Sequence, residues 1–480
     1  MPDAVSAPVT LESMRRRLKA CGQEHLLAHW DSLPESNRRA LLSRLADLPL
    51  ESLRAMLAET ESHAGAGLDS VEPVPVHRRD QRDATRFRAE GERLLREGRV
   101  AAFTVAGGQG TRLGWRGPKG TFPATVITGK PLFRVFAEQI RAAERRYGRS
   151  IPWYVMTSPL NDAETRAFFK DNDYFGREAI DHFFLPQGVV PTLDLEGRVL
   201  LAERDEPAAN PDGHGGSLRA LRRSGAIDDM LARGISVMSY FQVDNPLVHV
   251  VDPLFLGLHA SAPDSSAEMS SKCVPKRNAQ EKVGVLCRAR GRGGRTVTRV
   301  VEYSDLPREL AERRGPEGRL VFDAGSIAVH AISVAFVARL TEDLDRFALP
   351  WHRAVKKTPY FDPATGRTIE PDKPNSVKFE SFVFDALELA ERSLVLETPR
   401  IEEFAPIKNA EGEDSPAHSH ELQSERAASW LESNGVKVPR RADGTVDARI
   451  EISPLTALEA ADLAGVAIPQ RVERGHDLVL

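Results

Sequence analysis

The feature that most constrains the fold is an alternation of short apolar runs with helical stretches, which extends from Val100 to about Ala410. Four apolar runs, at residues 100–105, 152–157, 180–186 and 237–243, are predicted to be buried strands. Intervening segments such as 132–147 and 162–169 have the apolar spacing of helices. Strands that alternate with helices form a mostly parallel central sheet with helices on both faces, so we predict an α/β fold.

Segments of different character flank this α/β region. From Leu11 to about Glu61 apolar residues recur at helical spacing, with breaks at Pro34 and Pro49, which predicts several short helices. The basic, polar stretch 77–99 is expected to be an exposed linker followed by a helix. From Glu411 the chain is polar and loop-like, then contains a Trp-bearing helix and short apolar runs. We predict an N-terminal helical region over 1–99, a central α/β domain over 100–410 and a small C-terminal domain over 411–480.

Composition excludes several classes of partner. The chain has 65 basic and 69 acidic residues, so no global field would attract nucleic acid or an anionic membrane. Three scattered cysteines, Cys21, Cys273 and Cys287, are too few for a disulfide framework. No secretory leader or long apolar run is apparent. These observations predict a cytoplasmic protein without a membrane partner, and they leave its oligomeric state open.

The densest chemical signal is the sequence AGGQGTRLG at residues 106–114, directly after the strand predicted to end at Val105. Glycines let backbone N–H groups approach an anion without an intervening Cβ, and a following helix start adds a positive dipole end. Arg112 adds a planar charged fork, and Lys119 in the turn GPKG adds a compact second cation. The loop is therefore expected to bind phosphate groups.

Two familiar phosphate-binding motifs do not fit this loop. A Walker P-loop requires Gly-Lys followed by Ser or Thr, whereas Trp115 follows Gly114 and Gly120 follows Lys119. A dinucleotide fingerprint requires a third glycine at the position of Leu113. A tight strand-to-helix turn without a ligand is the structural alternative, and the adjoining arginine and lysine argue against it.

AGGQGTRLG followed by PKG resembles the signature of the eukaryotic-type UDP-sugar pyrophosphorylases. Within that group the chain is most similar to the UDP-N-acetylglucosamine (N-acetylhexosamine) pyrophosphorylases. Matching stretches recur in order from about residue 11 to about 460, including PQG at 186–188, PDGHGG at 211–216, VDN at 243–245, KFE at 378–380 and PIKN at 406–409. The resemblance implies a Rossmann-like nucleotidyltransferase fold. It also implies that UTP and an N-acetylhexosamine 1-phosphate are converted into a UDP-N-acetylhexosamine and pyrophosphate.

The resemblance further implies how UTP would be bound. The glycine-rich loop would hold the uracil ring and the phosphates through Gly107, Gly108, Gln109, Gly110 and Thr111. Gln187 and Gly213 would hydrogen-bond the uracil edge, for which a side-chain amide offers both a donor and an acceptor. His214 stands where the family tends to carry Asn, and its imidazole can stack on the base. Lys408 matches a basic position near the phosphates.

A sugar pocket and a metal site follow from the same resemblance. The sugar contacts map to Gly284, Glu302, Tyr303, Ser326, Phe382 and Phe384. Ser326 ends the sequence DAGS where the family has NAGN, so a shorter hydroxyl replaces a sugar-binding amide. Asp244 follows a predicted strand, where open α/β sheets present ligand-binding groups, and its carboxylate suits Mg²⁺, the predicted cofactor. Without the resemblance, Asp244 is better explained as a helix cap or turn residue, the more common role of an Asp-Asn pair. His418 and His420 are expected to be solvent-exposed in a polar loop rather than metal ligands.

The predicted reaction is an in-line attack by a phosphate oxygen of the sugar 1-phosphate on the α-phosphorus of UTP. The nucleophile is already anionic, so positioning and charge neutralisation by Mg²⁺, Arg112, Lys119 and Lys378 would account for catalysis. Two alternatives stay open. His214 and Ser326 suggest glucose 1-phosphate as the acceptor, and a non-catalytic nucleotide-binding protein could share the fold.

Overall fold

The computed structural model describes residues 10–53, 55–57, 71–291, 294–344, 346–347 and 349–480, and these form two compact units. The smaller unit combines Met1–Ala66, Gly188–Gly216 and Ala348–Val383. The larger unit takes Gly67–Gln187, Ser217–Phe347 and Phe384–Leu480. The chain therefore crosses between the units five times. Residues 58–61 of the predicted N-terminal helical stretch lie outside the described residues.

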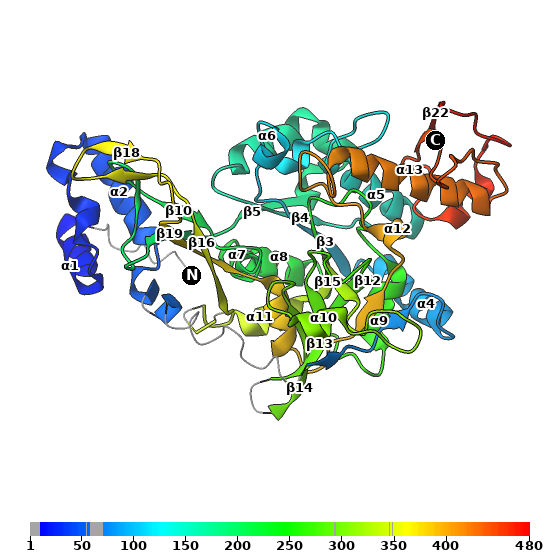
Figure 1. Ribbon diagram of the computed structural model, residues 1–480, viewed down its shortest axis with the longest axis horizontal. Helices are drawn as coiled ribbons and strands as arrows, with labels where there is room; N and C mark the ends of the chain where they lie inside the picture. The colour runs from blue at the N-terminus through cyan, green and yellow to red at the C-terminus, as the bar shows by residue number, and fades with distance from the viewer. Residues whose placement is uncertain (1–9, 54, 58–70, 292–293, 345, 348) are drawn as a thin grey trace. The chain divides into compact units, whose positions relative to one another are not determined.

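An eleven-stranded sheet forms the centre of the larger unit (Figure 1). Its main path runs β2 (His77–Arg78), β20 (Val395–Glu397), β12 (Met269–Pro275), β15 (Ala324–Ser333), β11 (Val237–Gln242), β3 (Val100–Val105), β4 (Trp153–Thr157) and β5 (His182–Pro186). Strands β11, β3, β4 and β5 are parallel, as are β2, β20 and β12, whereas β15 is antiparallel to β11 and β12. Beside β15 the sheet continues through β13 (Val285–Arg290), β14 (Thr296–Val301) and β1 (Glu72–Pro73). The predicted mostly parallel α/β sheet is confirmed.

Helices bury the apolar strands of this sheet. α5 (Leu132–Tyr147) buries apolar residues at helical spacing, among them Phe133, Phe136 and Ile140, and ends at Gly148, whose φ of 69° is left-handed. α5 shares one apolar core with α4 (Ala84–Arg96), α9 (Pro253–Ser261) and strands β3, β4 and β11. Five of the six residues of β3 are buried, as expected of a strand covered on both faces. Further helices of this unit are α6 (Asp162–Asp171), α7 (Gly216–Arg223), α8 (Ala226–Ala232), α10 (Arg308–Glu312), α11 (Val334–Leu340) and α12 (Arg400–Glu403).

Strand β15 contains a bulge near the end of β11. Ser271 of β12 pairs with His330, and Cys273 pairs with Ser326, so the single residue Lys272 lies opposite residues 327–329. Ala328, at the middle of this bulge, has a φ of 52°, which is rare for a residue other than glycine. Such strained backbone persists where the surrounding structure holds it and is frequent at functional sites.

The C-terminal part of the larger unit has an apolar core of its own. It consists of α13 (Pro416–Ser433), β21 (Arg449–Glu451) and β22 (Asp477–Val479), packed around residues such as Trp430 and Ile450. The Glu451 carboxylate accepts hydrogen bonds from the backbone N–H groups of Ile127 (2.8 Å) and Thr128 (2.9 Å), and from the Thr128 hydroxyl. This carboxylate therefore ties the C-terminal part to the loop that precedes α5.

Two stretches predicted as loop or linker are regular structure. Residues 77–78 form strand β2 rather than exposed linker. The polar sequence after Glu411 becomes helix α13 at Pro416, because Ser415 caps the helix through the His418 N–H and proline lacks only an N–H that the first turn leaves unused. His418 and His420 are therefore half-buried on a helix, not exposed in a loop, and His418 Nδ1 accepts a hydrogen bond from the Asp414 N–H (3.1 Å).

The smaller unit packs N-terminal helices against a small sheet. The predicted short helices include α1 (Leu11–Cys21) and α2 (Glu35–Asp47). Their buried residues, among them Leu18 and Leu45, share an apolar core with Val377 and Phe379 of β19 (Ser376–Ser381). β19 pairs with β16 (Trp351–Lys356) and β7 (Leu193–Asp194). Two-stranded pairs complete the unit: β6 (Val189–Pro191) with β10 (Ala209–Pro211), β8 (Leu201–Glu203) with β9 (Glu206–Pro207), and β17 (Tyr360–Asp362) with β18 (Arg367–Ile369).

Within the described part of the chain, no helix combines the length and apolar character needed to cross a membrane.

Candidate functional site

Three of the predicted site segments follow parallel strands of the larger unit. The glycine-rich loop follows β3, Gln187 follows β5 and Asp244 follows β11. Because the carboxyl ends of parallel strands meet at one edge of a sheet, this is where an open α/β fold binds ligands. The larger unit therefore carries the glycine-rich loop, the predicted uracil contact Gln187 and the predicted metal ligand Asp244 along one sheet edge.

The glycine-rich loop is held in shape by its own backbone. Lys119 N–H donates to the Gly108 carbonyl (3.1 Å), and Gly110 N–H donates to the Gly117 carbonyl (3.0 Å). The amide of Asn161 donates to the carbonyls of Ala106 (3.0 Å) and Gly108 (3.3 Å). These bonds occupy carbonyl groups of the loop. Gly108, Thr111 and Arg112 are exposed, as binding of a ligand by the loop requires.

Gln187 lies directly against this loop. A Cβ added to Gly107 would lie 2.8 Å from Gln187 Oε1, so a larger residue there would have to displace this amide. Gln187 N–H donates to the Thr157 carbonyl (2.9 Å), which fixes the start of the segment after β5. The structure thus brings together Gly107 and Gln187, which are eighty positions apart in the chain.

Lys119 and Asp244 face each other in a largely buried position. Lys119 Nζ lies 3.7 Å from Asp244 Oδ2, and the two side chains are only 16% and 14% exposed. Burial lowers the pKa of Lys119, the cations Lys408 and Arg112 lower it further, and Asp244 opposes the shift. Ile407 N–H donates to the Asp244 carbonyl (2.8 Å), which brings the neighbouring Lys408 to the same place. Three cations around one carboxylate leave a local excess of positive charge that suits a polyphosphate.

The bulge of β15 borders the same place. A cavity of about 60 Å³ is lined by Gln242, Asp244, Ser326, Ala328 and Lys408, with further residues of the same strands. Ser326 N–H donates to the Gly284 carbonyl (2.8 Å). A Cβ on Gly284 would lie 3.4 Å from Glu302 Oε1. Four predicted residues of the sugar and metal sites, Gly284, Glu302, Ser326 and Asp244, are therefore linked through one strand edge.

Two further predicted sugar contacts in the larger unit differ in their surroundings. Tyr303 is 47% exposed in the turn after β14, whereas Phe384 is 7% exposed.

The other predicted residues belong to the smaller unit. Gly213 has a φ of 83°, and a Cβ there would lie 2.4 Å from the Ser381 carbonyl oxygen, so the PDGHGG loop packs closely on the end of β19. His214 Nδ1 accepts a hydrogen bond from the Val383 N–H (3.1 Å). The pKa of His214 is lowered to about 4, mainly by burial, so its ring is neutral near pH 7. The expectation that His214 stacks on the uracil base stays untested, but one face of its ring already stacks on Phe382, with ring centroids 5.1 Å apart.

Asn161 and Asn245 are structural members of the site that the sequence analysis missed. Asn245 donates to the Glu403 carbonyl (2.6 Å) and accepts from the Ala405 N–H (3.1 Å), which fixes the strand edge after Asp244. Asn161 supports the glycine-rich loop from the segment after β4. The signal available in the sequence was their position shortly after a predicted strand, where ligand-binding segments of this fold begin.

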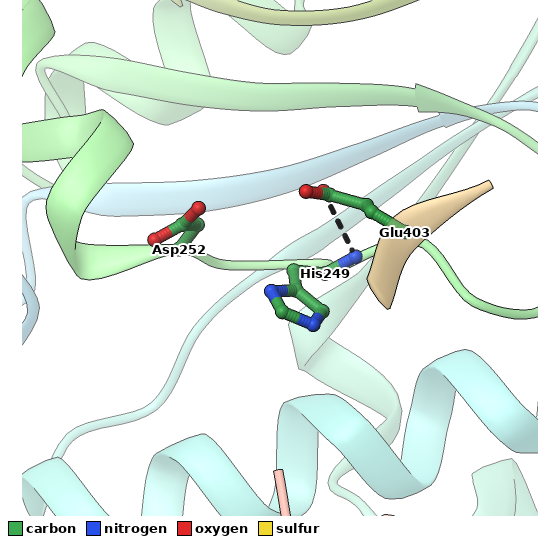
Figure 2. Close-up of side chains that lie close together, drawn as sticks. All are labelled: His249, Asp252 and Glu403. Atoms are coloured by element: carbon green, nitrogen blue, oxygen red, sulfur yellow. Dashed lines mark hydrogen bonds between the residues drawn. The ribbon is translucent and has the colours of Figure 1, made fainter. Parts of the chain in front are cut away.

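A second group of ligating side chains, none of which lines the cavity beside Asp244, already contains a cation. One ligand atom each of His249, Asp252 and Glu403 lie within 4.8 Å of one another, a spacing that a metal ion could use. However, Lys272 Nζ lies 2.8 Å from Asp252 and 2.6 Å from Glu403, and Arg79 lies 2.6 Å from Asp252. The backbone N–H of His249 donates a hydrogen bond to the Glu403 carboxylate (3.2 Å). Figure 2 shows that the His249 ring points away from that carboxylate. Lys272 thus occupies the cation position, and the group is a buried ion-pair network.

The chain is similar to known proteins over most of its length. Residues 50–429 match the model of the family described as UTP–glucose-1-phosphate uridylyltransferase. UDP-N-acetylhexosamine pyrophosphorylase-like protein 1 of Homo sapiens is 35% identical, with 94% of each chain covered. UDP-N-acetylglucosamine pyrophosphorylase of Saccharomyces cerevisiae is 32% identical, covering 87% of this chain and 90% of the yeast protein.

Solved structures resemble the fold. The uridine diphosphate N-acetylglucosamine pyrophosphorylase of Trypanosoma brucei, solved with an inhibitor, matches with a TM-score of 0.81 and 25% identity, covering 100% of this chain and 99% of that one. A UDP-glucose phosphorylase of the same organism has a TM-score of 0.60 at 16% identity, covering 95% of this chain and 98% of that one, and supports the fold alone.

Proposed function

The chain belongs to the UTP–glucose-1-phosphate uridylyltransferase family, and from that membership we propose that it transfers the uridylyl group of UTP to an N-acetylhexosamine 1-phosphate. The products are a UDP-N-acetylhexosamine and pyrophosphate. The observation that carries the proposal is the largely buried Lys119–Asp244 pair at the sheet edge that also carries the glycine-rich loop. The cations Arg112 and Lys408 lie near this pair. The names of the human and yeast relatives favour the acetamido sugar.

The reaction needs no base from the protein. A phosphate oxygen of the sugar 1-phosphate forms a bond to the α-phosphorus of UTP, and the bond from that phosphorus to the pyrophosphate oxygen breaks. The attacking oxygen is already anionic, so the protein has to orient two anions and neutralise their charge. We assign orientation of UTP to Gly107–Thr111, Gln187, Gly213 and His214. Charge neutralisation is assigned to Arg112, Lys119, Lys378 and Lys408.

A divalent metal ion fits the residues beside Lys119. Asp244 offers a carboxylate oxygen, and the adjoining cavity of about 60 Å³ also presents the side chains of Gln242 and Ser326. Mg²⁺ binds through one or two carboxylates and keeps several waters, which matches this donor set. We propose that Asp244 holds Mg²⁺, which when bound would neutralise phosphate charge. Lys119 lies opposite the same carboxylate and orients it.

Glucose 1-phosphate is the competing acceptor. Ser326 supplies a short hydroxyl where the family pattern has an amide, and it lies at the cavity next to Asp244. We propose Gly284, Glu302, Tyr303, Ser326, Phe382 and Phe384 as the sugar-binding set. Turnover with the glucose compound equal to or better than with the N-acetylated compounds would reverse the assignment of the acceptor.

The decisive experiment is an assay of pyrophosphate release. UTP and Mg²⁺ would be mixed with N-acetylglucosamine, N-acetylgalactosamine or glucose 1-phosphate, and wild-type protein would be compared with Lys119→Met. We expect release with the N-acetylated sugars and its loss in the variant. Binding of UTP without release from any of the three would indicate a nucleotide-binding protein instead.

We also infer the setting of the enzyme. The three cysteines, all within the described residues, form no disulfide, which fits a reducing, cytoplasmic compartment. The proposed division of labour places catalysis in residues 100–410, with the N-terminal region 1–99 and the C-terminal region 411–480 as supporting domains.

A further inference from the structure

The small sheet of the smaller unit presents one face with a histidine that has no assigned role. β16 and β19 are antiparallel, with His352 opposite Glu380 and Ala354 opposite Lys378. Opposite residues share a face and side chains alternate along a strand, so His352, Lys378 and Glu380 lie on one face. The other face carries Phe379 into the apolar core.

His352 forms one layer of a stack of three rings. Its ring centroid lies 4.2 Å from that of Phe382, with an interplanar angle of 28°. Phe382 also stacks on His214, with ring centroids 5.1 Å apart and an interplanar angle of 17°. All three rings are half-buried. Both imidazoles stack on Phe382 through their ring faces, and their ring nitrogens lie at the ring edges, where a nitrogen forms directed hydrogen bonds.

The position of His352 along the sheet relates it to two residues of the proposed site. Alternate residues of a strand are about 6.6 Å apart, so Lys378 and Phe382 are separated by roughly 13 Å along β19 and the residue that follows it. His352 lies opposite Glu380, about midway between them. Lys378 is the cation proposed to act on phosphate, and Phe382 is a proposed sugar contact. A residue between these two therefore faces the junction of a sugar ring and its phosphate.

We propose that His352 is a binding residue for the sugar 1-phosphate, which it contacts through a ring nitrogen while its ring face holds Phe382 in place. This inference rests on the proposed function, because that function places Lys378 and Phe382 at the acceptor. The chemistry recognised is a hydroxyl or acetamido group next to an anomeric phosphate. Glu380, exposed on the same face, is the nearest carboxylate along the strand, and its oxygens can accept a hydrogen bond from a sugar hydroxyl.

The test separates the ring stack from the hydrogen bond. His352→Phe keeps an aromatic ring against Phe382 but removes both ring nitrogens, and His352→Gln restores a donor and an acceptor without the stack. We expect His352→Phe to raise the KM for N-acetylglucosamine 1-phosphate about tenfold, the loss of one hydrogen bond, with an unchanged KM for UTP. His352→Gln should recover part of that loss. Arg353→Ala, at the adjacent exposed position on the opposite face, is the matched control and should leave both KM values unchanged.

Calorimetry distinguishes failure of this inference from failure of the proposed function. N-acetylglucosamine 1-phosphate would be titrated into UTP-bound wild type and His352→Phe, with unfolding temperatures measured in parallel. Weaker binding to the variant at an unchanged unfolding temperature supports the role of His352 even if wild type proves to release no pyrophosphate. Equal affinity of both proteins, or a change confined to UTP binding, would overturn it. Absence of turnover in wild type with all three sugars would count against the proposed function alone.

Discussion

Replacement of Lys119 by methionine should separate activity from stability. The ammonium group lies 3.7 Å from Asp244 with 16% of the side chain exposed. At that distance, and with an effective dielectric constant of about 20, the attraction alone is about 4.5 kcal/mol. Burial and repulsion from Lys408 and Arg112 oppose it strongly enough that the pKa of Lys119 is lowered, so the folded protein on balance disfavours this charge. Methionine has a similar volume without the charge, so we expect the free energy of unfolding to change by no more than about 1 kcal/mol.

Turnover should respond very differently. The loss of one preorganised group that stabilises developing charge lowers kcat by about 10² to 10³, or roughly 2.7 to 4 kcal/mol. Steady-state pyrophosphate release gives kcat, and urea unfolding of the same preparations gives stability. Lys170→Met, at an exposed position on α6, serves as the control and should change neither quantity. A Lys119→Met enzyme with near-wild-type kcat would refute the assignment. A loss of several kcal/mol of stability would show that the pair with Asp244 is structural.

Three further predictions concern stability and are measured by chemical denaturation. Gly213→Ala should destabilise the fold by more than about 2 kcal/mol, because its Cβ would lie 2.4 Å from the Ser381 carbonyl oxygen. The control is Gly98→Ala, which has a φ of 69° and open space around it. It should be destabilised only by backbone strain, by about 1 to 2 kcal/mol. Lys272→Met leaves two buried carboxylates without their shared cation and should lose about 3 to 5 kcal/mol, and a neutral result would refute the network. Burial lowers the pKa of His259 to about 4, so the unfolded chain takes up a proton below about pH 6.5 while the folded protein does not. Stability should therefore fall from pH 6.5 towards pH 4, less steeply in His259→Gln, and equal slopes would contradict this.

The sequence predicts most of the larger unit because its elements repeat with a clear period. Strand β3 and helix α5 have the bounds that their apolar patterns indicate. The failures have a physical cause. The first turns of α13 bury Ser419 and Ser424 rather than large apolar side chains. The sequence of these turns is therefore as polar as that of a loop, and apolar spacing does not reveal the helix. β2 is two residues long and owes its pairing to β20, more than 300 positions away, so no local pattern reveals it.

The candidate site was predictable where the parallel sheet brings strand ends to one edge. Lys119 and Asp244 are 125 positions apart, yet both follow strands that are neighbours in the sheet. The division of the predicted residues between two units was not predictable, because contacts between separate stretches define the smaller unit and no composition change marks its borders. The positive φ of Ala328 could not be predicted from the sequence for a related reason. A left-handed alanine within a strand is imposed by its neighbours and leaves no trace in local propensity.

The carboxylate of Glu451 has a consequence for the order in which the protein matures during synthesis. It accepts hydrogen bonds from the backbone N–H groups of Ile127 and Thr128, which belong to the segment that links the glycine-rich loop to α5. A ribosome produces residue 451 only after more than nine tenths of the chain has emerged, and chains begin to fold from their N-terminal side. The nascent protein can therefore assemble its sheet while the segment before α5 still lacks the carboxylate that accepts these two hydrogen bonds. These bonds therefore form late in biosynthesis, and a chain that ends before residue 451 would contain every strand of the central sheet but lack the carboxylate that holds this segment.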